Sequence, residues 1–487
     1  MVHTHSTQFH AKDVTVDQSI SASTRGQLPT VRNRLRQAVG LPFLEVLSRS
    51  LVEESCRCIQ HRWRERIYTP WITLSLFLSQ ILSDDHSCDD TVDRMQKYRY
   101  DQGLGAVVPN TGSYCEARQR LPENLVWNLV RRTGQSIHQK AKRSWLFQGR
   151  PVKIVDGSTV VMPDTPANQQ AYPQANSQAP GVGFPIARIL VVFSLAVGTV
   201  LDAALGPYQG KQTSELALLR QIITEFQPGD IVLGDRFFCS YWLIAALQAR
   251  GVDVLFRLHQ CRTADFRRGR RLGREDHLVT WPKPSQAADW MSRDEYDAMP
   301  AELTVRELRI RVRDKTKRVR SLVIVTTLLD ARTYQDEELR DLFRQRWHAE
   351  LDLRTLKTEM QMEMLRTKSP EMVRKEIAVH FLAYNLIRGI MAEAARAEKV
   401  KPRRLSFKGA LHTVRAFEES HLYDPSWIQA DLAKLIELIG KKRVGSRPDR
   451  YEPRAVKRRP KPHPLLKMPR GVAKHLIELG KIPYNKA

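Results

Sequence analysis

The stretch that decides the fold is Ile189–Leu201, which reads ILVVFSLAVGTVL and is the longest largely apolar run of the chain. A helix that crosses a membrane needs about 20 such residues, so this run is too short for one. It is rich in valine and contains Gly198, which favours two buried strands joined by a tight hairpin. We therefore expect hairpin strands near residues 187–197 and 199–206.

Further strands are expected on both sides of this hairpin, and two of them deliver an aspartate at their ends. Lys153-Ile154-Val155 is followed by Asp156 in the sequence Asp-Gly-Ser-Thr, and Ile231-Val232-Leu233 is followed by Gly234-Asp235. Gly234 would let a ligand or another backbone approach closely. Taken singly, each aspartate is more simply a turn or N-cap residue. The remaining elements of this region are expected near 211–226 (helix), 240–250 (helix) and 253–258 (strand).

A third acid lies in the segment DLFRQRWHAELDLRTLKTE, residues 341–359, which predicts one amphipathic helix. One stripe of this helix is apolar, and a second stripe at helical spacing holds Phe343, Arg346, Glu350, Arg354 and Lys357. Glu350 thus lies among three cations on a face that packing does not need. It could bind a metal while its neighbours hold phosphates. Ion pairing of Glu350 with Arg346 and Arg354 on a solvated helix is the alternative.

Three convergent carboxylates would support a particular chemistry. Asp156, Asp235 and Glu350 offer the oxygen ligands that Mg²⁺ prefers. Two such ions can activate a water or a 3′-hydroxyl and stabilise the leaving oxygen during in-line attack on a phosphate. These three acids are therefore candidate catalytic and metal-binding residues, with Mn²⁺ as a possible substitute for Mg²⁺.

In these motifs the chain resembles the DDE transposases of bacterial insertion sequences, specifically the insertion-sequence-four family. That family has a Tyr-x2-Arg-x3-Glu-x6-Lys signature around its third acid, and Phe343, Arg346, Glu350 and Lys357 match it except at the first position. Asp156 matches the family's Asp-Gly-Ser/Thr motif, and Asp235 followed by Arg236 matches its Gly-Asp-Arg motif. The catalytic resemblance covers about residues 145–390.

The resemblance implies a ribonuclease H-like catalytic core of mixed α+β and α/β class. Three strands followed by alternating helix and strand is the order of that fold, and its first strand lies near its fourth. Asp156 and Asp235 would then be neighbours, while Glu350 would come from a later helix. The expected division is a disordered segment (1–30), a helical domain that binds DNA ends (31–145), the catalytic domain (146–400) with a β-rich insertion at about 259–334, and a C-terminal helical part with a basic, proline-rich tail (401–487).

The expected insertion carries many cations. A basic loop contains Arg267, Arg268, Arg270 and Arg271, and strand-like segments follow it. In relatives this insertion touches the transposon end, and a tryptophan there can stack on a displaced base. Trp281 is a candidate for that role, although a tryptophan of the core is the simpler interpretation.

Composition points to a polyanionic partner. The chain of 487 residues has 78 Lys and Arg against 53 Asp and Glu, a net charge of +25, which is typical of nucleic-acid binding. Its six cysteines show no zinc-ligand spacing and predict reduced thiols in a cytosolic protein. Several arginines of the N-terminal helices are candidates to face DNA: Arg62, Arg64, Arg66, Arg118 and Arg120.

The sequence therefore predicts a cytoplasmic, nucleoid-associated bacterial DNA transposase. Its substrates would be double-stranded terminal inverted repeats and target DNA, without a membrane or a small-molecule substrate, and a homodimer would act on the DNA. Arg346 and Lys357 would clamp phosphates, and Arg354 is a weaker candidate. Phe343 is a further candidate to contact DNA, and Arg236 would orient the backbone or pair with a carboxylate. Two alternatives remain: a structure-selective metal-dependent endonuclease, and a catalytically silent DNA-binding repressor derived from a transposase.

Overall fold

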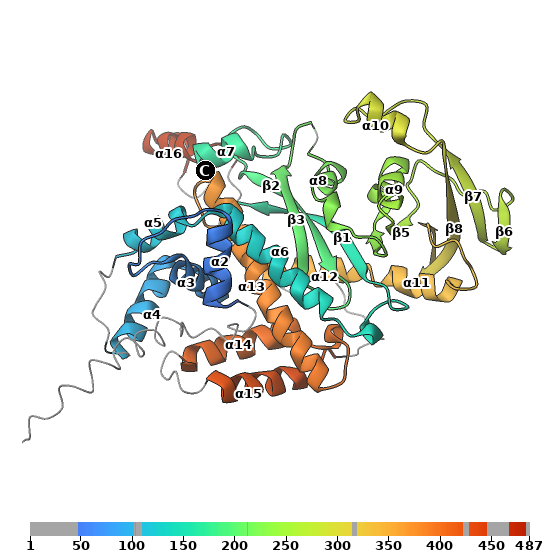
Figure 1. The fold of residues 1–487 in the computed structure, drawn as a ribbon. Coiled ribbons are helices and arrows are strands. Elements are labelled where there is room, and N and C mark those ends of the chain that lie inside the picture. The colour runs from blue at the N-terminus through green and yellow to red at the C-terminus, as the bar shows by residue number, and fades with distance from the viewer. Residues whose placement is uncertain are drawn as a thin grey trace, which may run out of the picture.

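The computed structural model describes residues 47–101, 103, 110–211, 213–313, 319–421, 428–445 and 467–483. Within these ranges the chain forms one elongated body, with helices α2–α5 at one end and strands β6–β8 at the other (Figure 1). The expected disordered segment at 1–30 and most of the basic tail lie outside the described residues. No described helix is both long and apolar enough to cross a membrane.

A nine-stranded sheet runs through the middle of the protein in the order β3-β2-β1-β4-β5-β9-β8-β7-β6. The first part of this order places β1 beside β4, as the predicted strand order requires. The strands are β1 (Val152–Val161), β2 (Ile186–Ser194), β3 (Val200–Pro207), β4 (Ile231–Gly234), β5 (Asp253–Arg257), β6 (Arg270–Gly273), β7 (Asp276–Pro282), β8 (Glu302–Arg313) and β9 (Val319–Thr326). The mixed α+β class is thus confirmed.

The apolar run that opened the sequence analysis forms the hairpin of β2 and β3. The two strands pair antiparallel, and Gly198 adopts a φ of 84° in the turn between them. That left-handed conformation carries a steric penalty for residues with a side chain, which explains the glycine. The predicted hairpin is confirmed with small shifts of its ends.

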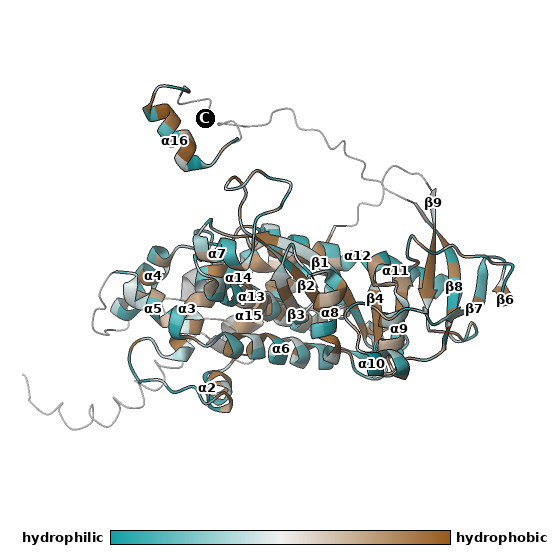
Figure 2. Ribbon diagram, turned by 90° about the horizontal axis from the view of Figure 1, so that it is seen from above, coloured by the Kyte–Doolittle hydropathy of each residue, from teal (hydrophilic) through white to brown (hydrophobic). Residues whose placement is uncertain are grey.

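Helices cover both faces of the sheet. On one face lie α11 (Asp336–Arg344), α12 (Trp347–Arg354) and the long helix α13 (Pro370–Ala397), and on the other lie α8 (Glu215–Gln221) and α9 (Tyr241–Gln248). Figure 2 shows α11 and α12 on the opposite side of the strands from α8 and α9. In β1, Ile154 belongs to the first core and Val155 to the second, as alternation along a strand requires.

The Glu350 segment departs from the single helix that its periodicity predicts. The chain is α-helical to Arg344, tightens at residues 345–346, resumes as α12 and ends in a π-helical segment, η4 (Thr355–Glu359). The tightening is shown by 3₁₀-type hydrogen bonds between residues three apart, in which Arg346 N–H donates to Phe343 O and Ala349 N–H donates to Arg346 O. Such changes of pitch rotate the faces of successive turns, so the predicted stripe is not continuous.

The N-terminal helices are α2 (Arg49–Cys58), α3 (Pro70–Leu82), α4 (Cys88–Asp101), α5 (Gly112–Arg120) and α6 (Glu123–Gln139). Thr69 caps α3 by accepting a hydrogen bond from the backbone of Ile72, with Pro70 at the first helical position. Residues of α2, α3 and α6 share one hydrophobic core with the sheet. The helices are therefore present, but this shared core gives no boundary near residue 145, and the separate domain stays a prediction.

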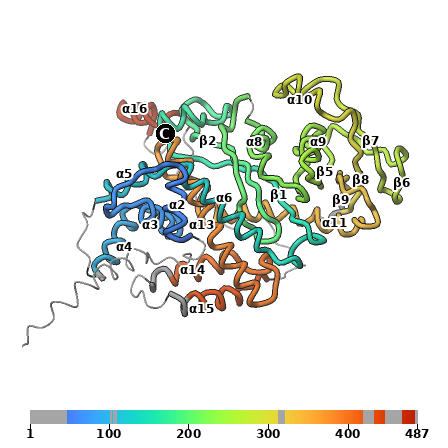
Figure 3. Tube along the Cα trace, viewed as in Figure 1, coloured from blue at the N-terminus to red at the C-terminus, as the bar shows by residue number. Residues whose placement is uncertain are grey.

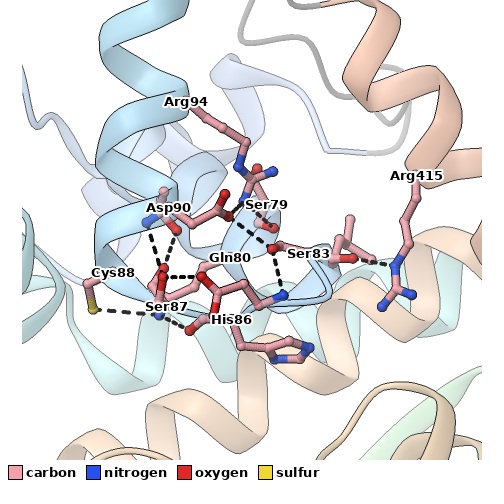
Figure 4. Close-up of polar contacts among 12 residues, drawn as sticks. Ser79, Gln80, Ser83, His86, Ser87, Cys88, Asp90, Arg94 and Arg415 are labelled. Carbon is pink, nitrogen blue, oxygen red and sulfur yellow. Dashed lines mark hydrogen bonds and ion pairs between the residues drawn. The ribbon is translucent and has the colours of Figure 1, made fainter.

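Polar contacts fix the end of α3. Ser83 donates to Asp90 over 3.0 Å, and Asp90 pairs with Arg94 over 2.8 Å (Figure 4). From the C-terminal half, Arg415 donates to the backbone oxygen of Leu82. Arg118 corrects one expectation, because it is only 8% exposed and donates to the side chain of Gln80, so it does not face DNA.

The C-terminal helices pack around α13. Helices α14 (Phe407–His421) and α15 (Ile428–Lys441) lie side by side against it, as the course of the chain in Figure 3 shows. Two further short helices are α7 (Pro166–Ala171) and α16 (Arg470–Glu478), and α16 stands apart from the other helices in Figure 2.

The insertion is rich in strands, as predicted, and it extends the sheet rather than forming a separate body. Strand β9 pairs with β5, and β8, β7 and β6 follow outward, with α10 (Arg293–Ala298) in the connection between β7 and β8. The expected basic loop is partly ordered as a strand, because Arg270 and Arg271 begin β6.

Candidate functional site

Asp156 and Asp235 lie level with each other on adjacent parallel strands. Strand β1 pairs with β4 through Ile154 opposite Leu233, and two further residues bring the chain to Asp156 and Asp235. Neighbouring strands are about 4.8 Å apart. One expectation needs correction: Asp156 is not at the end of its strand, because β1 continues to Val161 in pairing with β2. It is the ladder with β4 that ends there.

Both aspartates project toward the face of the sheet that carries α12. Side chains alternate along a strand, so Asp156 shares its face with Ile154 and Asp235 shares its face with Leu233. Ile154 and Leu233 both belong to the core that includes Ala349 and Leu353 of α12. The backbone of Asp235 remains extended, with φ −82° and ψ −172°, which continues the alternation past the end of β4.

Glu350 and Arg346 are electrostatic neighbours of Asp156. Burial, the largest cause, raises the pKa of Asp156 to about 7; the Arg346 guanidinium and the Gly157 N–H oppose this rise, and the carboxylates of Glu350 and Glu215 add to it. The Gly157 N–H donates to Asp156 Oδ1 over 3.0 Å. The structure thus brings together two of the three predicted acids and one of the predicted cations.

Arg346 and Glu350 also form the ion pair that was the alternative interpretation. Arg346 Nη2 lies 2.9 Å from Glu350 Oε1, one helical turn apart, and both side chains are partly exposed. Lys357 lies 3.5 Å from Glu363, and Arg354 is exposed. An ion pair at this spacing is weak in solvent, so it does not prevent Glu350 from changing partners.

Asp235 has a local role as well. Its Oδ1 accepts a hydrogen bond of 2.8 Å from the backbone of Phe237 and caps a short 3₁₀ turn. Arg236 lies over the ring of Phe237, 5.2 Å from its centre, and Phe237 is exposed. Asp235 is therefore an N-cap residue, as the simpler interpretation predicted. Only Oδ1 makes the capping hydrogen bond, and Oδ2 takes no part in the cap.

The donor chemistry of the site suits a hard divalent cation. Asp156, Asp235 and Glu350 supply only carboxylate oxygens, the ligand type that Mg²⁺ and Mn²⁺ prefer. Among the described residues, however, no group of three or more acidic, histidine or cysteine side chains is gathered closely enough to hold an ion. Glu350 would have to leave Arg346 before it could act as a ligand.

Two of the predicted DNA-contacting residues are buried. Phe343 is 7% exposed and packs in the core behind α11. Trp281 is 4% exposed, its Nε1 donates to Glu307 over 2.9 Å, and Arg262 covers its ring at 3.9 Å. Trp281 is thus placed as a residue of the core, the simpler of its two interpretations.

The four arginines of the insertion lie on the surface. Arg267 and Arg268 are 90% and 82% exposed in their side chains and share the carboxylate of Asp265. Arg270 and Arg271 are exposed on β6, the outermost strand of the sheet. Because β6 is far along the strand order from β1, these cations are not part of the carboxylate site.

Glu215 was missed by the sequence analysis. It is the first residue of α8, and burial raises its pKa, with the carboxylate of Asp235 as the next cause and Arg188 opposing. An acid in the first turn of a helix is common because it complements the helix dipole, so the sequence gives no signal that this one lies near two other carboxylates.

A buried ion network holds α12 in place. Asp352 is 1% exposed, and its carboxylate accepts hydrogen bonds from Arg388 of α13 and from Arg403. Arg403 also donates to the backbone oxygens of Ser194 and Leu195 in the turn after β2. The helix that carries Glu350 is thereby tied to both α13 and the central hairpin.

Two comparisons with known proteins cover the residues of this region. Residues 147–386 match the family described as the transposase DDE domain. The transposase InsG for insertion sequence element IS4 of Escherichia coli (strain K12) is 28% identical over 369 residues, which are 74% of this chain and 78% of that protein. The match spans β1, β4 and α12, the elements that carry the three acids. Over residues 147–386 the chain is therefore similar to the transposase DDE domain, and over most of its length to the transposase of insertion sequence element IS4.

Proposed function

We propose that this protein binds the terminal inverted repeats of its own insertion sequence and catalyses Mg²⁺-dependent strand cleavage and strand transfer. The observation that carries the proposal is the approach of Glu350 on α12, and of Arg346 at the N-cap of this helix, to Asp156 on β1 within the matched domain. Carboxylates and a guanidinium from separate elements at one site suit chemistry on a phosphate.

In the proposed site Asp156, Asp235 and Glu350 would hold two Mg²⁺ ions, for which Mn²⁺ can substitute. When bound, such ions polarise phosphate oxygens and lower the pKa of a coordinated water or hydroxyl. Asp156 must lose its proton before it can bind, because only the carboxylate is a ligand. Metal affinity should therefore rise with pH up to about pH 7, near the pKa of Asp156.

The cations around the acids would bind the DNA backbone. Arg346 is placed to release Glu350 and take a phosphate, since both of its partners are carboxylates that a metal would neutralise. Arg354 and Lys357 lie about two and three helical turns beyond Arg346, and Arg236 adjoins Asp235. Arg267, Arg268, Arg270 and Arg271 would contact phosphates farther along the same duplex.

The test is a cleavage and strand-transfer assay. Purified full-length protein is incubated with DNA that carries the element's own flanking inverted repeats, with Mg²⁺ or with EDTA. We expect metal-dependent nicks at the repeat boundary and joined products. Nicks without joined products would indicate an endonuclease, and tight binding of ends without cleavage under Mg²⁺ or Mn²⁺ would indicate a repressor.

The active form on DNA is proposed to be a homodimer, because two ends must be joined in one event. Light scattering of the protein with short end duplexes would report its mass. A complex that holds one protein chain and still performs strand transfer would contradict this part of the proposal.

A further inference from the structure

The carboxylate of Glu215 occupies the place that a side chain at position 157 would take. A Cβ built on Gly157 would lie 2.2 Å from Glu215 Oε1, 2.3 Å from its Cδ and 2.8 Å from its Cγ. These distances are far inside van der Waals contact, and the three atoms nearest to that Cβ all belong to Glu215. The glycine after Asp156 is therefore explained by the close approach of this one acid.

The Glu215 carboxylate has no partner that would account for its position. Within the described part of the chain it takes part in no hydrogen bond and no ion pair. Arg188 is the cation that acts on it, yet the Arg188 guanidinium donates to the backbone oxygens of Thr213 and Tyr208, over 3.2 and 3.4 Å. A partly buried carboxylate without a partner is costly, so a structural ion pair does not explain the residue.

Glu215 reaches the site from the face opposite Glu350. Helix α8 packs on the face of the sheet away from α12, against β2, β3 and the turn that follows Asp235. The ladder of β1 with β4 ends at Ile154 and Leu233, so on that side of β1 no strand is paired with Asp156 and Gly157, whereas β2 remains paired on the other side. Ligands commonly bind beyond the carboxyl ends of parallel strands, where such an opening occurs.

We propose that Glu215 is a fourth carboxylate of the site and binds a divalent metal ion together with Asp156 and Asp235. The inference rests on the proposed metal-dependent function and extends it to a residue outside the three-acid motif. Asp156 and Asp235 would come from the two strands, Glu350 from one face of the sheet and Glu215 from the other. Four carboxylates would let two cations share the site with fewer positions left to water.

The first experiment measures metal binding without any reaction. Binding of Mn²⁺ to the full-length protein is followed by electron paramagnetic resonance and by calorimetry, in wild type, Glu215→Gln, Asp156→Asn and the control Asp164→Asn. Asp164 is an exposed acid in the loop after β1. We expect Glu215→Gln to weaken Mn²⁺ binding about tenfold or more, while Asp164→Asn binds as wild type does.

The outcomes separate this inference from the function on which it rests. Wild-type binding by Glu215→Gln, together with weakened binding by Asp156→Asn, would overturn the role of Glu215 and leave the proposed function standing. Wild-type binding by Asp156→Asn as well would instead contradict the metal site of the proposed function.

A second experiment displaces the carboxylate without removing it. In Gly157→Ala the new methyl group would occupy the position of Glu215 Oε1 and force that side chain away. We expect Gly157→Ala to weaken Mn²⁺ binding, and to add no further loss when it is introduced into Glu215→Ala. An equal loss in both backgrounds would show that Gly157 acts on the site by another route and would contradict the proposal. This double-mutant cycle isolates the coupling between positions 157 and 215 even if either substitution lowers stability.

Discussion

Arg403 donates from Nη1 to both carboxylate oxygens of Asp352, over 2.8 and 2.6 Å, in a region from which water is nearly excluded. Arg388 donates to the same carboxylate from α13. Since Asp352 lies two residues after Glu350, this network fixes the helix that carries the third acid without touching the site itself.

Removal of Asp352 should be strongly destabilising. Asp352→Ala would leave two buried guanidinium groups without their counter-charge, and we expect a loss of about 3–5 kcal/mol in the free energy of unfolding. Urea denaturation measures it, with Asp341→Ala as the control, because Asp341 is 69% exposed in its side chain. A loss as small as that of the control would show that the network is not needed.

Glu350→Ala should abolish strand cleavage and leave the binding of DNA ends nearly intact. The side chain is partly exposed and its ion pair with Arg346 is of the weak kind, so the fold should tolerate the change. Cleavage of end-bearing DNA and electrophoretic mobility shifts are measured on the same preparations, again beside Asp341→Ala. Unchanged cleavage by pure Glu350→Ala protein would refute the three-carboxylate site.

The stability of the metal-free protein should depend on pH through Asp156. Its pKa is about 7 in the folded state and near 3.8 in the unfolded chain, so between these values the folded state binds the extra proton. Stability in EDTA should therefore fall as pH rises from about 4 to 7 and level off above that, by linkage. Asp156→Asn should flatten this part of the profile, measured as thermal midpoint against pH. An unchanged slope in the variant would assign the effect to other groups.

Trp281→Ala should act on folding rather than on DNA. The indole is buried and hydrogen-bonded to Glu307, and its removal should lower the free energy of unfolding by about 3–5 kcal/mol. Below its unfolding temperature the variant should bind end DNA about as tightly as the wild type. A loss of DNA affinity with normal stability would support the base-stacking role instead.

The strands that precede the two aspartates were predictable from local pattern, whereas the position of the first strand beside the fourth was expected from the resemblance to the ribonuclease H-like fold. Short β-branched runs that are followed by Asp-Gly or Gly-Asp predict the strands, and the parallel pairing of β1 with β4 places Asp156 beside Asp235. The break between α11 and α12 was not predictable, because side chains of a 3.6-residue period fit a helix with or without one tightened turn. Phe343 was predicted on the same helical face as Arg346 and Glu350, and this was wrong. Because the turn between α11 and α12 is tightened, Phe343 faces the core and is buried.

Glu215 could not be found from sequence because its role depends on a contact across the sheet. In the sequence, Ser214-Glu215 looks like the start of any capped helix. Gly157, which makes room for Glu215, is already accounted for in the sequence as part of the Asp-Gly-Ser motif. Arg118 shows the same limit for charge. An arginine in a basic helical region was expected on the surface, yet it is buried against Gln80.

The hydrogen bonds between β5 and β9 make the insertion an extension of the sheet that carries Asp156. The sheet therefore fixes the distance between β1 and the outermost strand, β6. Six strand-to-strand steps separate β1 from β6, which at about 4.8 Å each span roughly 29 Å. At about 3.4 Å per base pair this corresponds to roughly eight base pairs of duplex. A DNA end bound by the arginines of β6 would thus be held at a fixed distance from Asp156. The distance from protein contact to scissile phosphate would be set by the number of strands between them.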